Sequence, residues 1–181
     1  MKLVTLKITT SQRGDYVPPQ AGDTAITADE ENIILDSVEK ISPESQNPDD
    51  EDTMELTTEA HLSVDANGRY TIAYEESELS GMEGTKTTIT FLDNDRGILT
   101  ILREGTVNAT LVLQKGKFHT GLYETPVMPL DITTMTYKLE NKISENGGYA
   151  TADYSLRIGG VTTTKTKLTV QVTEQHSEAF V

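Results

Sequence analysis

The sequence contains no cysteine. A chain without thiols can form no disulfide, no Cys-ligated zinc site, no iron–sulfur cluster and no thiolate nucleophile. It also lacks any apolar run near the ~20 residues of a membrane-spanning helix. Residues 1–9 alternate polar and apolar side chains and do not form the continuous apolar segment of a secretory signal. These absences predict a cytoplasmic protein that does not depend on a membrane.

Basic residues are scarce. The chain has 15 Lys and Arg against 29 Asp and Glu, which gives a net charge of −14. Such an acidic chain repels nucleic-acid backbones and anionic membrane surfaces, so we expect neither as a partner. The acids are concentrated in residues 15–53, which contain a single basic residue, Lys40, and the run Asp49 to Asp52. A basic protein is therefore one possible partner.

Alternation with a period of two residues is the dominant pattern. In residues 150–158 and 168–172, apolar side chains alternate with polar ones, as in a strand with one buried face. Turn signals separate such runs, and Asn67-Gly68 predicts a tight type I′ hairpin. The predicted strands are 3–10, 54–64, 68–76, 84–93, 96–103, 107–114, 117–123, 128–140, 149–158 and 161–173.

About ten short strands joined mainly by tight turns predict an all-β fold, a closed antiparallel barrel, because closure removes exposed strand edges. The 181 residues suffice for one domain with its own core. We therefore predict a single domain over residues 1–181. In strand 128–140 the apolar face changes from even-numbered to odd-numbered positions, which predicts a bulge near Thr133-Thr134.

Residues 15–53 break the alternation and form an acidic insertion between the first and second strands. They hold four of the six prolines. Thr27 to Glu30 resembles a helix-capping box, and Ile34, Leu35, Val38 and Ile41 follow at helical spacing. We predict one short amphipathic helix over 28–41, with a disordered acidic loop as the alternative.

The stretch 74–91 carries four glutamates, Glu75, Glu76, Glu78 and Glu83. A catalytic pair needs two acids held close together in a partly dry cleft. Glu75 and Glu76 are strand neighbours and point to opposite faces, while the other two flank the expected turn at Ser80-Gly81. We interpret all four as solvated charges of a hairpin.

No other pattern points to catalysis, a metal or a cofactor. The three histidines are far apart in the sequence, and no nucleotide-binding or nucleophile-elbow motif is present. Asp93-Asn94-Asp95 with Glu104 resembles a calcium loop, but Ile98 occupies the position that requires glycine. We predict a non-enzymatic protein with no catalytic residue, no metal and no cofactor.

Candidate ligand-binding residues come from the strands. Arg103 ends an otherwise apolar strand, where it would either form a structural ion pair or bind an anionic ligand inside the barrel. Strand tyrosines could line a mainly apolar ligand cavity or simply fill the core. These tyrosines are Tyr74, Tyr123, Tyr137 and Tyr154. We take Arg103, Tyr74, Tyr123 and Tyr154 as the ligand-binding candidates.

Residues 72–88 resemble the signature of the YwiB-like family of small bacterial β-barrel proteins. Further matches follow in order: Arg103-Glu-Gly105, Phe118, Tyr123-Glu-Thr125-Pro126, Thr134, Gly147-Gly148 and Tyr154-Ser-Leu. Val127-Met128-Pro129 departs from the family, which tends to have an aromatic residue and glycine there. The resemblance implies a calycin-like barrel, akin to lipocalins and fatty-acid-binding proteins. The chain has no tryptophan and so lacks the Gly-x-Trp mark of lipocalins.

The family's function is unknown, so the resemblance transfers no active site. Fold analogy favours binding of a small, partly apolar or anionic ligand in the barrel interior. The alternative is an interaction module that acts through its acidic insertion, with the barrel filled by side chains.

Overall fold

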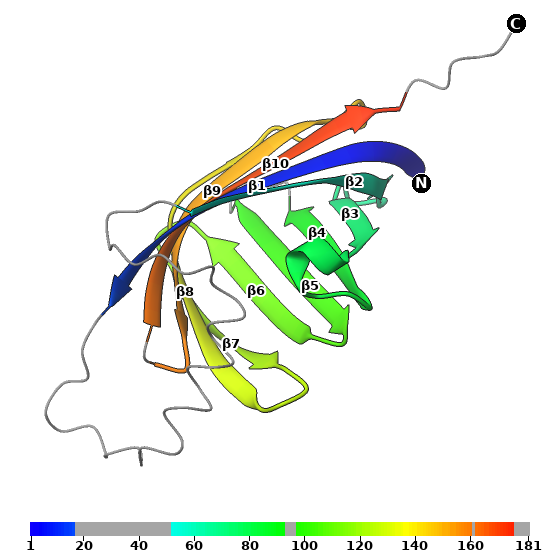
Figure 1. The fold of residues 1–181 in the computed structure, drawn as a ribbon. Coiled ribbons are helices and arrows are strands. Elements are labelled where there is room, and N and C mark those ends of the chain that lie inside the picture. Colours follow the sequence, from blue (N-terminus) through cyan, green and yellow to red (C-terminus); the bar gives the residue numbers. More distant parts are fainter. Residues whose placement is uncertain (17–51, 93–96, 161, 176–181) are drawn as a thin grey trace, which may run out of the picture.

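The structure is a computed structural model that describes residues 1–16, 52–92, 97–160 and 162–175. Each strand in this part of the chain pairs antiparallel with the next, and β10 pairs with β1 to close a barrel (Figure 1). The predicted all-β, closed antiparallel barrel is confirmed. The strands are β1 (Lys2–Tyr16), β2 (Asp52–Val64), β3 (Tyr70–Glu75), β4 (Thr85–Leu92), β5 (Ile98–Gly105), β6 (Asn108–Gln114), β7 (Phe118–Glu124), β8 (Pro129–Asn141), β9 (Gly148–Ile158) and β10 (Thr162–Glu174).

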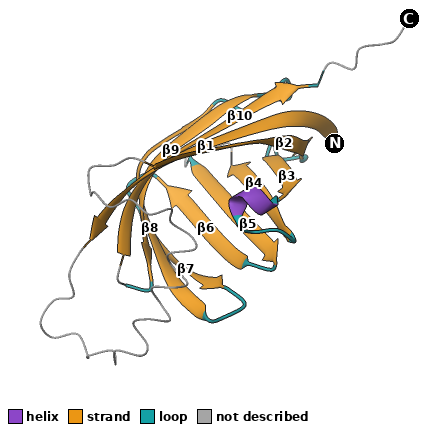
Figure 2. Ribbon diagram, viewed as in Figure 1, coloured by secondary structure: helices purple, strands orange, loops and turns teal. Residues whose placement is uncertain are grey.

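Strand lengths divide the barrel into two sides. The long strands β1, β2, β8, β9 and β10 curve around one side, and the shorter strands β3 to β7 form the other (Figure 1). Figure 2 shows one helical turn in the described part of the chain, η1 (Glu78–Ser80), between β3 and β4. No helix in these ranges is long and apolar enough to span a membrane.

The core follows from strand alternation. On β4 and β5 the odd-numbered side chains face inward. Phe91 of β4 pairs with Leu99 of β5, and Leu99 pairs with Leu113 of β6. These three side chains are almost completely buried, with Phe91 only 1% exposed. Burial of one such side chain stabilises the fold by ~1.5–3 kcal/mol. This layer fills one end of the barrel and leaves its other end for a cavity.

The strand boundaries agree with the prediction to within two residues, except at the end of β1. That strand continues to Tyr16 because its pairing with β10 extends that far. The ends of the predicted 15–53 insertion therefore belong to β1 and β2. The predicted helix over 28–41 lies outside the described residues.

The bulge in β8 lies later than predicted. The register between β8 and β9 shifts between Thr136 and Lys138, so Tyr137 is the extra residue. Even-numbered side chains thus remain inside through Thr136, and Tyr137 is 49% exposed. The prediction placed the change near Thr133-Thr134 because it assumed that threonine would not be buried, whereas Thr134 donates a hydrogen bond to the Val112 carbonyl at 2.9 Å.

The hairpin at Asn67-Gly68 occurs, but its turn type was predicted wrongly. The Asp65 amide bonds the Arg69 carbonyl at 3.0 Å, and the Gly68 amide bonds the Asp65 carbonyl at 3.1 Å. The loop therefore has three residues, with Gly68 at φ 75°. This is the common alternative to the two-residue turn, with glycine in the left-handed position. The Asp65 carboxylate favours it by accepting the Asn67 amide at 2.8 Å.

The contact between β6 and β7 has the fewest paired residues in the described barrel. It consists of Asn108 with Glu124 and Ala109 with Tyr123. Farther along, β8 reaches β6 directly, because the Thr134 hydroxyl of β8 donates to the Val112 carbonyl of β6 at 2.9 Å. β7 is therefore held mainly by β8, and the pairing of Ala109 with Tyr123 joins it to β6.

Candidate functional site

A cavity of about 620 Å³ lies inside the barrel. Its apolar wall includes Ile89, Ile101 and Leu111 from β4, β5 and β6, and Ile132 from β8. At one end it is lined by Met54 and Glu78, which are both exposed, so the cavity reaches solvent there. Polar groups lie between this opening and the apolar wall.

A continuous row of cross-strand neighbours carries these polar groups. The order across β3 to β7 is Tyr74, Thr87, Arg103, Ala109 and Tyr123. Each side chain in the row faces the interior because strand alternation gives paired residues the same face. Ala109 lies between Arg103 and Tyr123 in this row, and its small side chain projects little into the interior.

Glu76 joins this row from the end of β3. Its amide bonds the Thr85 carbonyl at 2.8 Å, which continues the ladder one residue past the strand. Glu76 therefore points inward like Tyr74, and only 6% of it is exposed. Its Oε1 accepts hydrogen bonds from the Tyr74 hydroxyl at 3.0 Å and the Thr87 hydroxyl at 2.6 Å.

The interpretation of Glu76 as a solvated surface charge was therefore wrong. Glu75, Glu78 and Glu83 are exposed, as predicted. The sequence did contain the signal, since Glu76 follows the inward Tyr74 by two residues and strand alternation places both on one face. We had placed Glu76 on the strand but interpreted its carboxylate as solvated. Thr87 was also missed, because threonine is common on either face of a strand.

Arg103 is held beside Glu76 by charge and not by a hydrogen bond. Its Nε lies 4.0 Å from Glu76 Oε1, and 24% of its side chain is exposed. This Nε is buried and has no hydrogen-bond partner in the described part of the chain. A guanidinium has five N–H donors, so Arg103 retains a large capacity for hydrogen bonding toward the cavity that it lines.

The three inward tyrosines share an environment that keeps their phenols protonated. Burial raises the pKa of Tyr74, Tyr123 and Tyr154. The negative charge of Glu76 adds to the pKa increase of Tyr74, and the positive charge of Arg103 opposes the increase at all three. The Arg103 charge therefore reaches all three phenols.

We expect the barrel to lose stability at alkaline pH because of these phenols. The unfolded chain releases a phenolic proton near pH ~10, but the folded chain does so at higher pH. The stabilisation is thus fully present below pH ~10 and is lost as pH rises toward the raised folded pKa values. The loss approaches ~1.4 kcal/mol per pH unit for each retained proton.

Urea unfolding at a series of alkaline pH values measures this loss. A Tyr74→Phe variant should show a shallower decline than the wild type, because one late-titrating phenol is absent. An equal decline in both proteins would contradict the assigned role of Tyr74.

All four candidate ligand-binding residues line this one cavity: Arg103, Tyr74, Tyr123 and Tyr154. Tyr137, also considered for the interior, points outward and its hydroxyl lies 3.3 Å from the Ser155 hydroxyl. That the four bind a ligand stays a prediction.

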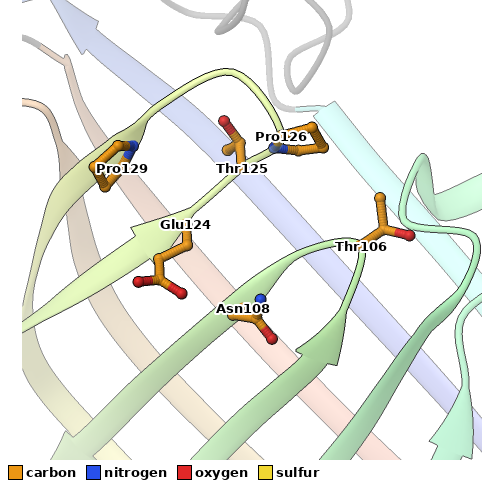
Figure 3. A pocket seen from close by; sticks show the side chains of 6 residues that line it. All are labelled: Thr106, Asn108, Glu124, Thr125, Pro126 and Pro129. Carbon is orange, nitrogen blue, oxygen red and sulfur yellow. The ribbon is translucent and has the colours of Figure 1, made fainter.

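A second hollow lies outside the barrel cavity, beside the turn between β7 and β8 (Figure 3). The Thr125 hydroxyl there donates to the Met128 carbonyl at 2.9 Å and accepts the Met128 amide at 3.2 Å. Asn108 likewise accepts the Gly105 amide at 3.1 Å. These polar groups already hold turns, so this hollow is the weaker candidate. Thr125 also stabilises the turn in which Val127-Met128 departs from the family pattern.

The described residues contain no group of three or more His, Cys, Asp or Glu that could hold a metal ion. Asp93, Asn94 and Asp95, considered for a calcium loop, lie outside those residues.

Comparison with known proteins places the chain in a family. The family described as Domain of unknown function (DUF1934) matches residues 40–170. The chain belongs to this family. Its structure is similar to the crystal structure of the ywiB protein from Bacillus subtilis, with a TM-score of 0.67 and 14% identity over 97% of this chain and 93% of that one. At this identity the likeness shows the fold alone. A search of curated proteins gives no match.

The resemblance to the YwiB-like family is thus confirmed, and the protein is a barrel of the DUF1934 family.

Proposed function

We propose that this DUF1934 protein binds a small, partly apolar molecule inside its barrel without transforming it chemically. The main support is the position of Arg103, which lines a cavity of about 620 Å³ and donates no hydrogen bond to any residue of the described ranges. A buried donor without an acceptor is unfavourable, so it marks a place for a ligand atom.

The composition of the cavity supports the same proposal. Ligand sites are mostly apolar, with a few polar groups that orient the ligand. Here aliphatic residues form the wall, and the hydroxyls of Tyr123 and Tyr154 accompany Arg103. The calycin-like character implied by the resemblance agrees with such a use of the interior, by fold analogy.

The alternative, an interaction module with a barrel filled by side chains, fits the cavity less well. Its acidic insertion falls largely in residues 17–51, outside the described residues. Failure of the binding experiment below would make the interaction module the better hypothesis.

Thermal unfolding of the full chain with a panel of small amphiphiles tests the proposal. The panel contains octanoic acid, phenylpropanoic acid and naphthoic acid, each with its primary amide. A ligand at about a hundredfold excess over its Kd stabilises the native state by ~2.7 kcal/mol. For a chain of this length we expect the Tm to rise by roughly 5–10 °C.

Two tryptophan substitutions provide the matched control. Ile101 lines the cavity, so Ile101→Trp should fill it and abolish the rise in Tm. Leu122 is 46% exposed on β7, so Leu122→Trp should leave the rise unchanged. Absence of a shift with every compound, or an equal shift in Ile101→Trp, would refute binding in the barrel.

A further inference from the structure

We infer that the ligand is a monoanionic carboxylic acid, with its carboxylate at Arg103 and Tyr123 and its hydrocarbon body against the aliphatic wall. This inference rests on the proposed function and specifies the ligand class of the same cavity.

The Arg103 guanidinium has unused hydrogen-bonding capacity. Its Nε lies 4.0 Å from Glu76 Oε1, too far for a hydrogen bond. None of its five donors is used within the described residues. A planar fork of free N–H groups matches the two oxygens of a carboxylate, which can accept two parallel hydrogen bonds.

Glu76 already accepts hydrogen bonds from other donors. Its Oε1 accepts the hydroxyls of Tyr74 and Thr87, from β3 and β4. Glu76 therefore attracts the guanidinium through charge while its nearest oxygen is satisfied by neutral groups. This arrangement positions Arg103 and leaves its Nη groups for another acceptor.

Tyr123 offers a second donor near Arg103. It lies two strands away in the same row, with the small Ala109 between the two residues. The Tyr123 hydroxyl makes no hydrogen bond to residues in the described part of the barrel, although the side chain is buried and lines the cavity. Because burial raises the pKa of Tyr123, the phenol keeps a proton that it can donate. Arg103 and Tyr123 thus offer donors from two sides of the Ala109 position.

The charged residues around the cavity favour a monoanionic ligand over a dianionic one. Arg103 is the one cationic side chain among the described lining residues, whereas Asp52, Glu76 and Glu78 are acidic. A dianionic phosphate would retain an unneutralised charge near these carboxylates, which is costly in a partly buried site. A carboxylate brings one negative charge near these acids and a dianion brings two, so the carboxylate is repelled less while it still accepts the Arg103 hydrogen bonds.

The wall below the polar row is suited to a hydrocarbon. Ile89 pairs with Ile101, and Ile101 with Leu111, so three aliphatic side chains lie side by side one step deeper than Arg103. Ile132 of β8 continues this surface. An acid with its carboxylate in the polar row would place its apolar body against this layer.

Calorimetric titration of the full chain with ligands that differ only in the head group tests the inference. The octyl series is octanoic acid, octanamide and octylphosphonic acid, and equivalent phenylpropyl and naphthyl series vary the body. At neutral pH we expect each acid to bind roughly 10- to 100-fold more tightly than its amide, the effect of a hydrogen bond to a charged group. We expect the phosphonate to bind less tightly than the acid.

Two substitutions at Arg103 separate charge from geometry. Arg103→Met should reduce the affinity for the acid to that for the amide. Arg103→Lys keeps the charge but loses the planar fork, so its affinity for the acid should lie between those of the wild type and Arg103→Met. An unchanged preference for the acid in Arg103→Met would overturn the inference.

Removal of acidic charge tests the discrimination against dianions. Glu76→Gln should raise the affinity for octylphosphonic acid relative to octanoic acid. Asp52→Asn, at the exposed end of the cavity, should do so less strongly and serves as the second variant if Glu76→Gln does not fold. Tighter binding of the phosphonate than of the acid by the wild type would overturn the inference.

The outcomes also separate this inference from the proposed function. Binding that depends on the hydrocarbon body but not on the head group would overturn the carboxylate assignment and support the barrel as a binding site. Absence of binding by every member of the three series would overturn both.

Discussion

Replacement of Glu76 by alanine is expected to lower the free energy of unfolding by about 3 kcal/mol. The same replacement at its sequence neighbour Glu75 is expected to change it by no more than about 0.5 kcal/mol. The two residues are adjacent and chemically identical, but Glu75 is exposed on the outer face and Glu76 is buried in the barrel. They form a matched pair that isolates the effect of burial.

The expected loss at Glu76 has two sources. Alanine removes the acceptor of the Tyr74 and Thr87 hydroxyls, which are both buried and would lose their hydrogen-bond partner. It also leaves Arg103 without its nearby anion. Breaking a fully buried ion pair costs ~3–5 kcal/mol, and the partial exposure of Arg103 places this case at the lower end.

Urea unfolding of the three proteins measures the difference. Glu76→Gln adds a further comparison, because it keeps an acceptor oxygen but removes the charge, and should lose only ~1–2 kcal/mol. Similar stabilities of the Glu75→Ala and Glu76→Ala variants would show that Glu76 is a solvated charge, as the sequence first suggested.

The strand position of Glu76 could be predicted from the sequence, but its burial could not. Period-two alternation located every described strand because the pattern depends only on neighbouring residues in one strand. The same rule placed Glu76 in strand 68–76, on the face opposite Glu75. It did not reveal that Glu76 is buried, because the Thr87 hydroxyl that helps to satisfy its carboxylate comes from β4 and is brought there only by strand pairing.

The convergence of the candidate ligand-binding residues could be predicted only in part. The inward face of Arg103 follows from alternation with Leu99 and Ile101. To predict that Arg103 lies beside Ala109, and Ala109 beside Tyr123, one must also know the register of β5, β6 and β7. Register depends on turn geometry, and the Asp65 to Arg69 hairpin shows that a turn signal can be right in place and wrong in type.

The position of the β8 bulge illustrates a different limit. Threonine suits either face of a strand, so the run Thr133-Thr134 does not reveal which hydroxyl is buried. The structure buries Thr134 because its hydroxyl satisfies a carbonyl of β6 where β6 and β7 no longer pair. That acceptor becomes available only through tertiary structure.

Substitution of Gly105 by alanine is the other change from which we expect a large effect. It should lower the free energy of unfolding by about 3–5 kcal/mol. Gly105 ends β5 with φ 142°, a backbone conformation that side chains with a Cβ rarely adopt. A Cβ built there would lie 2.2 Å from the Gly84 carbonyl oxygen and 2.9 Å from Thr85 Cα. Both are backbone atoms, so β4 and β5 would have to separate at this point.

Gly81→Ala is the matched control for Gly105→Ala. Gly81 also has a positive φ, 68°, but a Cβ there would meet nothing within 4 Å. It should therefore lose only the ~1–2 kcal/mol of an unfavourable left-handed residue. Equal losses for the two variants in urea unfolding would show that backbone conformation, and not the contact between β4 and β5, determines the need for glycine.

The contact at Gly105 also bears on the cavity, which gives this prediction a second measurement. Gly105 pairs with Thr85, and Arg103 pairs with Thr87 one step along the same two strands. A separation of β4 from β5 would move Arg103 away from the Thr87 hydroxyl and Glu76, which positions its guanidinium. Under conditions where Gly105→Ala remains folded, it should therefore bind octanoic acid less tightly than the wild type. Equal affinities would mean that β4 and β5 accommodate the new methyl group without shifting the polar row.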